Sequence, residues 1–289
     1  DNLSRLGGLE RGSYHLEPTV TGPAWNYRNR VRFHVDVSNK HVGFLQRKSS
    51  SLVRIESCPI LTGQLNALLS DSKPLFEAAR KLMFANRGGK SRYLEVPAFA
   101  SERKVSLLDE EIDITVGEKR FFVTSEVFFQ SNRYLTAALG EYVAGKAIGT
   151  SVMDLYSGVG TFSAFLAQPG RRIVAVERQK QCLQLAKKHL GDCEFYTDAV
   201  EVWAKRQYPS VDTVVVDPPR TGLDQGVPSL IASWKPLRIV YVSCNSVTLA
   251  RDLQRFASEG YTVTTVRVFD LYPQTFHHEV VVVLDRREN

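Results

Sequence analysis

The spacing of hydrophobic residues changes character near residue 125. Beyond it, short apolar runs that predict buried strands alternate with stretches whose apolar residues recur every three to four positions, which is typical of helices. This alternation predicts a doubly wound, mostly parallel α/β sheet, closed by an antiparallel strand pair. The predicted strands cover 150–157, 171–177, 193–199, 211–219, 238–244, 261–270 and 277–285, and the predicted helices cover 130–148, 161–168, 178–192, 201–208, 227–234 and 246–260.

The front part of the chain has a mixed pattern that predicts a smaller α+β domain. Residues 28–37 and 41–46 read as two strands joined by a Ser-Asn-Lys turn. The periodicity of 63–83 predicts a helix, and Pro74 marks the point where this helix should break or restart. The sequence therefore predicts two domains, at 1–124 and 125–289.

The net charge of +6 is unevenly distributed along the chain. Residues 1–120 hold 19 Lys and Arg against 14 Asp and Glu, whereas the remaining residues hold 18 against 17. Residues 28–54 alone hold seven basic residues and one acidic residue, with aromatic residues between them. A run of this kind is usually a solvated face, but it also fits a surface that follows the phosphate backbone of a nucleic acid.

The sequence also argues against several classes of protein. No apolar run approaches the roughly 18 to 20 residues needed to cross a bilayer, and the first residues lack the apolar core of a signal peptide. The four cysteines include no short-spaced pair, which disfavours a disulfide framework. His277 and His278 are adjacent and cannot share one face of a strand or helix. We expect a cytoplasmic protein without a metal site.

A glycine-rich turn follows the first strand of the alternating region. Gly158 and Gly160 permit a tight turn and the close approach of a ligand to the backbone. Asp154 ends the preceding strand, and Glu177 ends the next one, where carboxylates meet ribose hydroxyls in nucleotide-binding units. The third glycine of the dinucleotide pattern is missing, which favours a ligand with adenosine but no pyrophosphate, such as S-adenosylmethionine. Asp198, after the third strand, is a candidate for contact with the adenine.

The segment DPPR, from Asp217 to Arg220, follows the fourth strand of this region. Ligands of such sheets bind outside the carboxyl ends of the strands, and two prolines stiffen the loop by fixing φ. A carboxylate on a stiff loop can hold a planar donor group, and Arg220 can hold a phosphate or a carbonyl oxygen. The alternative is an ordinary loop with one ion pair.

Cys244 ends the fifth strand and precedes a helix. A helix N-terminus favours an anion, so we expect a lowered pKa for this thiol. Asn245 beside it provides a hydrogen-bond donor and an acceptor. Alone, such a cysteine is usually inert core filler. Its neighbours at the same edge of the sheet make it a candidate nucleophile.

Three further residues complete the candidate set. Glu279 opens a strongly apolar strand, where a carboxylate is costly unless it is paired or protonated, so it is either salt-bridged or a tuned proton acceptor. Phe128, near the predicted domain boundary, offers a face on which a base can stack. Gln130 can hydrogen-bond to an amino acid or to the edge of a base.

Five segments together resemble the RNA uridine-5 methyltransferases, which transfer a methyl group from S-adenosylmethionine to C5 of uridine. They occur in the family's order, between about residues 125 and 280. The resemblance implies a Rossmann-like SAM-dependent methyltransferase domain over 125–289 and a basic RNA-binding central domain over 1–124. The segments are FFQSN, DLYSGVGTFS, VVVDPPRTGLD, YVSCNSVTLARDL and PQTFHHEV.

The resemblance implies a role for each matching position. Cys244 corresponds to the nucleophile and Glu279 to the general base. The positions that correspond to contacts with the flipped uracil are Phe128, Asp217, Arg220 and Asn245, and those that correspond to cofactor contacts are Gln130, Tyr156, Gly158, Gly160, Glu177, Asp198 and Asp217.

The implied chemistry explains these residue types. C5 of uracil is too weak a nucleophile to attack a sulfonium methyl group, whereas addition of a thiolate to C6 makes an enolate whose C5 is reactive. After methylation, C5 carries a methyl group and a proton, and a base such as Glu279 must remove that proton before the thiolate leaves. The target base has to leave its stack, which suits an aromatic partner such as Phe128.

The sequence departs from the family pattern in three respects. Ser246 stands where members commonly have Pro, which should only loosen the loop. The N-terminal β-barrel of many members is not visible. Of the four cysteines that hold an iron–sulfur cluster in many members, only Cys58 has a counterpart, so we expect no cluster. The Cys58 segment resembles the ribosomal-RNA branch, which favours 23S rRNA over tRNA as the substrate.

Two functions of other kinds stay open. An amino-group methyltransferase would have an aromatic residue after Asp-Pro-Pro, but Arg220 follows here, and Cys244 and Glu279 would have no role. A non-catalytic RNA-binding protein could keep the same fold, although the intact Cys244–Glu279 pair argues against it. We therefore expect a monomeric enzyme that acts on RNA and has no membrane partner.

Overall fold

The computed structural model describes residues 2–5, 7–10, 12–85, 92–206 and 211–287. Its contacts divide the chain into two compact units. The small unit is Pro23–Tyr134, and the large unit combines Asp1–Gly22 with Leu135–Asn289. This division differs from the predicted domains at both ends of the small unit, because residues 1–22 join the large unit and residues 125–134 join the small one.

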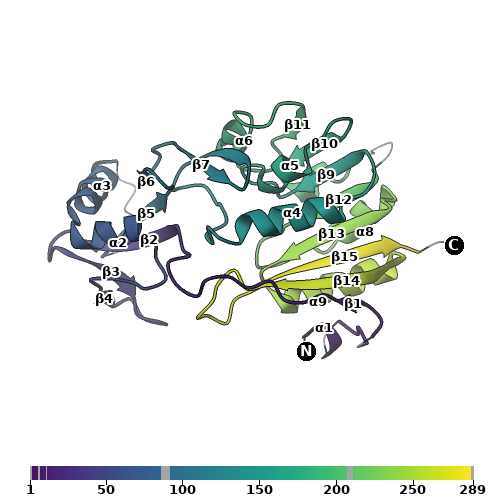
Figure 1. The fold of residues 1–289 in the computed structure, drawn as a ribbon, viewed down its shortest axis with the longest axis horizontal. Helices are drawn as coiled ribbons and strands as arrows, with labels where there is room; N and C mark the ends of the chain where they lie inside the picture. Colours follow the sequence, from purple (N-terminus) through teal and green to yellow (C-terminus); the bar gives the residue numbers. More distant parts are fainter. Residues whose placement is uncertain (1, 6, 11, 86–91, 207–210, 288–289) are drawn as a thin grey trace. The chain divides into compact units, whose positions relative to one another are not determined.

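The large unit is built on an eight-stranded sheet with the order β1-β14-β15-β13-β12-β9-β10-β11. Figure 1 shows these strands in succession, from β11 at the top to β14 and β1 near the bottom. Neighbouring strands are parallel except at β15, which is antiparallel to both β13 and β14. The predicted parallel sheet and closing antiparallel pair are confirmed. The strands are β1 His15–Leu16, β9 Ser151–Leu155, β10 Arg172–Val176, β11 Cys193–Tyr196, β12 Thr213–Val216, β13 Arg238–Ser243, β14 Tyr261–Phe269 and β15 Glu279–Arg286.

Helices cover both faces of this sheet, and each face has its own hydrophobic core. Side chains alternate along each strand, so Met153 and Leu155 of β9 enter one core and Val152 enters the other. The first core is closed by residues of α7, α8 and α9, and the second by residues of α4 and α5. The helices are α1 Asn2–Arg5, α4 Thr136–Lys146, α5 Thr161–Leu166, α6 Lys180–Ala186, α7 Val200–Trp203, α8 Val227–Ser233 and α9 Ser246–Ser258.

The predicted helices of the large unit are all shorter in the structure than in the sequence pattern, and the helix predicted over 178–192 is reduced to Lys180–Ala186. The helix predicted over 130–148 begins at Thr136, because the residues before it pair with the small unit's backbone, as the bond from Asn29 N to Ser131 O (2.9 Å) shows. The helix predicted over 201–208 ends early, and its last two residues lie outside the described part of the chain.

The strand β1 is a feature that the hydrophobic pattern does not reveal. Both of its side chains are exposed, so it carries no apolar signal, yet it pairs in parallel with β14. Glu17, the next residue, forms ion pairs with Lys146 at 2.7 Å and Arg267 at 3.3 Å. The N-terminal segment therefore belongs to the large unit through contacts with residues that are distant in the sequence.

The small unit contains a five-stranded antiparallel sheet, in the order β4-β3-β2-β5-β6, and the separate hairpin β7-β8. Pro74 lies in the first turn of α3, as predicted for a helix restart. Proline is tolerated there because the N–H groups of the first turn have no partner within the helix. The elements are β2 Arg30–Asp36, β3 His41–Leu45, β4 Leu52–Arg54, α2 Gly63–Ser70, α3 Lys73–Phe84, β5 Leu94–Ala100, β6 Val105–Leu107, β7 Ile112–Val116 and β8 Lys119–Val123.

The segment after β8 carries two candidate site residues and packs on the small unit. Phe129 is buried against Phe99, with ring centroids 5.7 Å apart in an edge-on arrangement. Its neighbour Phe128 faces outward and is 54% exposed. Phe128 and Gln130 therefore belong to the small unit, although the sequence places them at the start of the second domain.

Candidate active site

The predicted site residues of the large unit gather at the carboxyl edge of its sheet. The strands β9, β10, β12 and β13 are mutually parallel, so their carboxyl ends all lie at this edge. The strand β15 runs in the opposite direction, and its first residue, Glu279, therefore lies at the same edge.

Cys244 follows the last residue of β13, and Glu279 is the first residue of β15. Their immediate neighbours, Ser243 and Val280, pair across the two strands. The charge of Glu279 also acts on the Cys244 thiol, so the two side chains lie near each other. The structure therefore brings the predicted nucleophile and the predicted base together.

The Cys244 thiol is half-buried, and its pKa is raised to about 11. Burial is the largest cause, and the carboxylates of Glu279 and Asp217 add to the rise. The charge of Arg220 and a hydrogen bond from its side chain act in the opposite direction. The predicted lowering of this pKa is therefore wrong, because the thiol lies among buried carboxylates.

Asn245 occupies the helix end that the prediction assigned to the thiol. Its Oδ1 accepts a hydrogen bond from Val247 N at 3.0 Å and caps α9. Its Nδ2 donates to the backbone oxygen of Arg220 at 3.0 Å. Both polar atoms of the Asn245 amide are thus hydrogen-bonded to backbone groups. The predicted contact of Asn245 with uracil stays a prediction.

Glu279 is 3% exposed, and its pKa lies well above the usual value. Burial is the main cause, and the charge of Asp217 adds to it, whereas Arg220 opposes it. The Oε2 atom of Glu279 has no hydrogen-bond partner among the described residues. Of the two alternatives for this residue, the structure favours a tuned proton acceptor over a salt-bridged carboxylate.

Asp217 and Asp154 extend this group of carboxylates. Burial raises the pKa of Asp217 to about 7, and the charge of Asp154 contributes. Burial also raises the pKa of Asp154 to about 7. Hydrogen bonds from Ser163 N at 2.9 Å and from Ser163 Oγ at 2.5 Å lower this pKa but do not offset the burial. The Oδ1 atom of Asp154 is buried and finds no partner within the described ranges. This edge thus holds three carboxyl groups whose charged forms are disfavoured in the protein itself.

The loop that carries Asp217 and Arg220 is anchored by Asp252 of α9. Asp252 is fully buried, and its Oδ2 accepts hydrogen bonds from Leu223 N and from the hydroxyl of Tyr241, both at 2.8 Å. Leu223 lies in the loop and Tyr241 in β13, so one carboxylate connects the loop, the strand before Cys244 and the helix after it.

Two arginines complete this anchor. Arg251 pairs with Asp252 at 2.9 Å and donates to the backbone oxygen of Thr221 at 2.9 Å. Arg255 pairs with Asp252 at 3.1 Å. Sequence reasoning missed Asp252, although a signal exists: it stands three residues after Leu249, on the apolar face of a helical pattern.

The glycine turn after β9 is tied to Glu177. Gly158 N donates to Glu177 Oε2 at 3.1 Å. Gly158, Gly160 and Tyr156 all have positive φ, at 56°, 76° and 63°. A Cβ on Gly160 would come within 2.5 Å of Leu190, whereas one on Gly158 would meet nothing within 4 Å. Gly160 is therefore needed for packing, and Gly158 borders open space.

These residues fit a cationic, adenosine-containing cofactor. Asp154, Asp217 and Glu177 surround the turn with carboxylates, two of them with raised pKa values, and a sulfonium or ammonium group would stabilise their charged forms. Asp198 lies after β11 at the same edge and pairs with Arg206 at 2.6 Å. Its predicted contact with adenine stays a prediction.

Phe128 and Gln130 lie in the small unit, each with a distinctive environment. The guanidinium of Arg30 lies over the Phe128 ring, 5.7 Å from its centroid. Gln130 is 3% exposed, and its Oε1 has no hydrogen-bond partner in the described part of the chain. Their contacts with uracil and cofactor remain predictions, since the two units are described separately.

Across the part of the chain that the structure describes, no three His, Cys, Asp or Glu side chains are placed to hold a metal ion. Cys58 is half-buried and its backbone N donates to Asn66 Oδ1 at 2.8 Å. None of the helices there has the length and apolar character of a bilayer-spanning segment. The absence of a metal or an iron–sulfur cluster stays a prediction.

The fold is that of a solved methyltransferase. The tRNA (uracil-54, C5)-methyltransferase of Pyrococcus abyssi, solved with S-adenosyl-L-homocysteine, superimposes with a TM-score of 0.76 at 23% sequence identity. The match covers 98% of this chain and 80% of that one. This likeness shows that the chain has the Rossmann-like fold of that methyltransferase.

Sequence comparison gives the family. An uncharacterized RNA methyltransferase of Treponema denticola is 31% identical, over 94% of this chain and 70% of that protein. The 23S rRNA (uracil(1939)-C(5))-methyltransferase of Vibrio parahaemolyticus is 25% identical, over 94% and 72%. The family model described as tRNA (Uracil-5-)-methyltransferase matches residues 204–287. The chain belongs to the family of RNA uracil-5 methyltransferases, an enzyme family.

Proposed function

We propose that this enzyme methylates C5 of a specific uridine in RNA through a covalent bond between Cys244 and C6 of the base. The observation that carries the proposal is the proximity of Cys244 and Glu279, which adjoin the paired residues Ser243 and Val280 of β13 and β15. The charges of Asp217 and Arg220 act on both side chains. A thiol and a buried carboxylate at one point of the edge are the two groups that addition to C6 and proton removal from C5 require.

The first step needs the thiolate form of Cys244. Its pKa of about 11 means that the thiol is protonated at neutral pH in the protein alone. The Arg220 guanidinium favours the thiolate by charge and by a hydrogen bond. As the Sγ–C6 bond forms, the thiol proton leaves for a neighbouring carboxylate, and the C5–C6 double bond shifts its electrons towards the O4 carbonyl.

The last step needs the carboxylate of Glu279. S-adenosylmethionine supplies an electrophilic methyl group when it is bound, and the carboxylates of Asp154, Asp217 and Glu177 would hold it. Once C5 bears the methyl group, Glu279 accepts the C5 proton, the C5–C6 double bond reforms, and the Cys244 thiolate leaves. A raised pKa makes Glu279 a stronger base than an exposed carboxylate, which suits removal of a carbon-bound proton.

The RNA substrate is proposed to be 23S rRNA. The supporting observations are the Cys58 segment and the 23S rRNA specificity in the names of several relatives. The alternative is tRNA, which the matching family model and the solved neighbour name. Mapping 5-methyluridine in total RNA of cells with and without the protein separates them, since the lost modification lies either in the large ribosomal RNA or in tRNA.

RNA containing 5-fluorouridine tests the covalent step. With S-adenosylmethionine, the enzyme should form an adduct that survives denaturing electrophoresis, because fluorine cannot be removed from C5 as a proton. Cys244→Ala should abolish the adduct. The matched control is Cys193→Ala, since Cys193 is also a half-buried thiol of the large unit with a raised pKa, of about 12, and this variant should form the adduct normally.

The outcomes separate the competing functions. An adduct that persists in the Cys244→Ala variant rejects the nucleophile. An amino-group methyltransferase would methylate RNA without any adduct, and a non-catalytic RNA-binding protein would give neither product nor adduct.

A further inference from the structure

A cavity of about 410 Å³ lies within the small unit. It is open on one side and lies between the start of β2 and the segment that follows Cys58. Its size falls within the range of roughly 300–1,000 Å³ that is usual for small-ligand sites. We call it the arginine cavity, and its lining residues are Arg28, Arg30, Val31, Arg32, Phe44, Cys58, Ile60 and Leu61.

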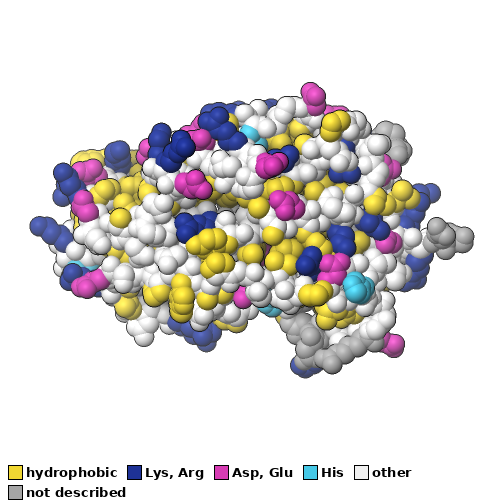
Figure 2. Space-filling view, in the orientation of Figure 1, with side chains coloured by type: hydrophobic (Ala, Val, Ile, Leu, Met, Phe, Trp, Pro, Cys, Tyr) yellow, Lys and Arg dark blue, Asp and Glu magenta, His cyan; other side chains and the backbone are white. Residues whose placement is uncertain are grey.

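The charge of the arginine cavity is one-sided. Three of its lining residues, Arg28, Arg30 and Arg32, are basic, and none of the described lining residues is acidic. On the face of the molecule in Figure 2, by contrast, Lys and Arg side chains are interspersed with Asp and Glu side chains. Arg30 and Arg32 are two residues apart in β2, so their side chains leave the strand on the same side, and Arg28 precedes the strand.

The Arg28 guanidinium is held in place with part of its donor capacity unused. Its Nε donates to the backbone oxygen of Arg30 at 2.9 Å, and its two Nη atoms have no partner among the described residues. Arg32 makes a single ion pair, with Glu95 at 3.2 Å, and the side chains of Arg32 and Glu95 are both more than half exposed. The guanidinium groups of Arg28 and Arg32 can therefore bind an anionic oxygen without first breaking a buried contact.

The opposite wall of the cavity is apolar and fixed. The Phe44 ring is stacked on the buried Phe33 ring, with centroids 6.0 Å apart and an angle of 10° between the planes. Val31, Ile60 and Leu61 complete this wall. A flat heterocycle packs against such a wall while its phosphate reaches the guanidinium groups, which is the combination that proteins use for single-stranded RNA.

Arg30 connects the cavity to the predicted uracil platform. It lines the cavity and also lies over the exposed ring of Phe128. All of these residues are in the small unit, so their arrangement does not depend on the large unit. A nucleotide in the cavity would therefore lie close to a base stacked on Phe128.

We propose that the arginine cavity binds one nucleotide of the substrate RNA that neighbours the methylated uridine, with its base against Phe44 and its phosphate on Arg28 and Arg32. The proposal rests on the proposed function, because it assigns a second contact to the same RNA. It gives the small unit a part in choosing the uridine, since a flanking nucleotide must be unstacked to enter the cavity.

The first experiment measures binding of a fluorescein-labelled oligouridylate of about ten nucleotides by anisotropy. The double variant Arg28→Gln, Arg32→Gln should weaken binding about tenfold and lower the salt dependence, because phosphate contacts are lost. The matched control is Arg120→Gln. Arg120 is 63% exposed and pairs with Asp113 at 3.1 Å, whereas Arg32 is 56% exposed and pairs with Glu95 at 3.2 Å. The control should bind within about twofold of wild type, since exposed pairs away from the site contribute little.

Two further measurements do not depend on removing charge. Ile60→Trp fills the cavity with all arginines in place and should also weaken oligouridylate binding. The oligouridylate should slow alkylation of Cys58 by N-ethylmaleimide, read for each cysteine by peptide mass spectrometry. Wild-type protein that does not bind the oligouridylate, an Arg120→Gln variant as weak as the double variant, or an Ile60→Trp variant that binds normally would each overturn the proposal.

The cavity assignment and the proposed function can each be rejected without the other. If the double variant methylates total RNA with the wild-type KM, the cavity assignment is rejected and the function stands. If wild-type protein with S-adenosylmethionine forms no 5-methyluridine in RNA from cells lacking the protein, the function itself is rejected.

Discussion

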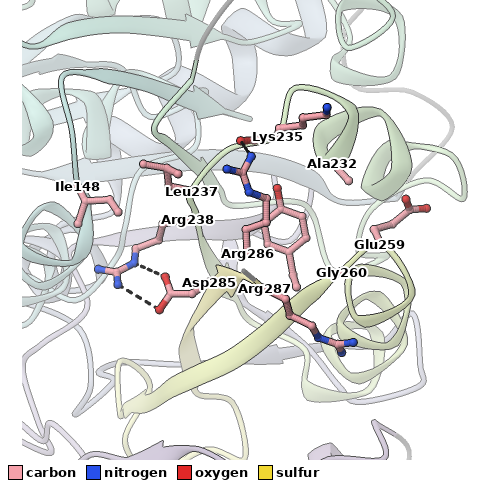
Figure 3. Close-up of a pocket in the computed structure, with 11 residues that line it drawn as sticks. Ile148, Ala232, Lys235, Leu237, Arg238, Glu259, Gly260, Asp285, Arg286 and Arg287 are labelled. Atoms are coloured by element: carbon pink, nitrogen blue, oxygen red, sulfur yellow. Dashed lines mark hydrogen bonds and ion pairs between the residues drawn. The ribbon is translucent and has the colours of Figure 1, made fainter. Parts of the chain in front are cut away.

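The two edges of the eight-stranded sheet differ in whether their charged side chains have partners within the protein. At the amino edge, a cavity of about 790 Å³ lies between the start of β13 and the end of β15. Figure 3 shows Arg238 and Asp285 joined there by two contacts, at 2.6 Å and 3.1 Å. Arg286 donates to the backbone oxygen of Lys235, also drawn in Figure 3. Arg238, Asp285 and Arg286, which line the amino edge, therefore have partners within the protein.

The carboxyl edge is the reverse case. Glu279 and Asp154 each have a buried carboxylate oxygen for which the described residues provide no partner. Their pKa values are raised by burial, and they lie near a third carboxylate, the half-buried Asp217. Such an arrangement destabilises the protein unless a ligand or a reaction uses it. The difference shows that unsatisfied charge, and not the size of a cavity, identifies the reactive edge.

The largest expected effect is on turnover, in the variant Glu279→Gln. Loss of the base should lower 5-methyluridine formation about 10³-fold, and the covalent adduct should accumulate on ordinary uridine RNA. Because the Glu279 carboxylate raises the pKa of Cys244, the amide should also shift the pH dependence of Cys244 alkylation to lower pH. Product formation measures the first effect, and iodoacetamide labelling between pH 7 and pH 10 measures the second.

Glu259→Gln is the matched control, since it removes a carboxylate that lines the cavity at the amino edge. It should change neither turnover nor the reactivity of Cys244. A Glu279→Gln variant with normal turnover would contradict the assignment of the reaction to the carboxyl edge.

The next effect is on stability, in the variant Asp252→Asn. The change removes the charge that pairs with Arg251 and Arg255 and weakens the anchor of the Asp217 loop. Breaking a buried network of this kind should lower the free energy of unfolding by about 3–5 kcal/mol. Urea denaturation measures it, and a loss below about 1 kcal/mol would show that the loop does not depend on Asp252.

A smaller effect concerns the pH dependence of stability, in the variant Asp154→Asn. The pKa of Asp154 rises from 3.8 to about 7 on folding, so its contribution to stability is complete below the unfolded value and is lost as pH rises through 7. The loss between pH 5 and pH 8 is about 2–3 kcal/mol. Asp154→Asn should remove that part of the wild-type pH dependence, as measured by denaturation at both pH values. An unchanged pH dependence would show that Asp154 is already charged at pH 5.

The smallest effect is expected at the amino edge, in the variant Arg238→Met. Its ion pair with Asp285 is partly exposed and should be worth about 1 kcal/mol or less. Methyl transfer should stay at the wild-type rate. A fall in turnover comparable with that of Asp252→Asn would mean that the two edges are coupled.

Much of the large unit follows from local patterns. The alternation of apolar strands and amphipathic helices predicts the parallel sheet, and strand ends predict where Asp217 and Cys244 lie, because the carboxyl ends of parallel strands share an edge. The strand β1 could not be predicted in this way, since its two exposed residues depend on β14, far along the chain.

The chemical states of the site residues were less predictable than their positions. The helix start beside Cys244 suggests a lowered pKa, yet Asn245 caps that helix and buried carboxylates surround the thiol. Asp252 carries a recognisable signal, a charge on an apolar helix face, but its partners come from a loop and a neighbouring strand. A pKa depends on every group nearby in space, and local sequence gives only some of them.

The sequence alone determined the class of sheet and the family, and it predicted the reactive groups, because strand and helix periodicity and short motifs are local properties of the chain. Only the tertiary structure decided that β15 inserts between β13 and β14. That insertion brings Glu279 near Cys244, although the two residues are 35 positions apart in the sequence. Strand order and register arise from the packing of the whole sheet, and they determine which acid meets the thiol.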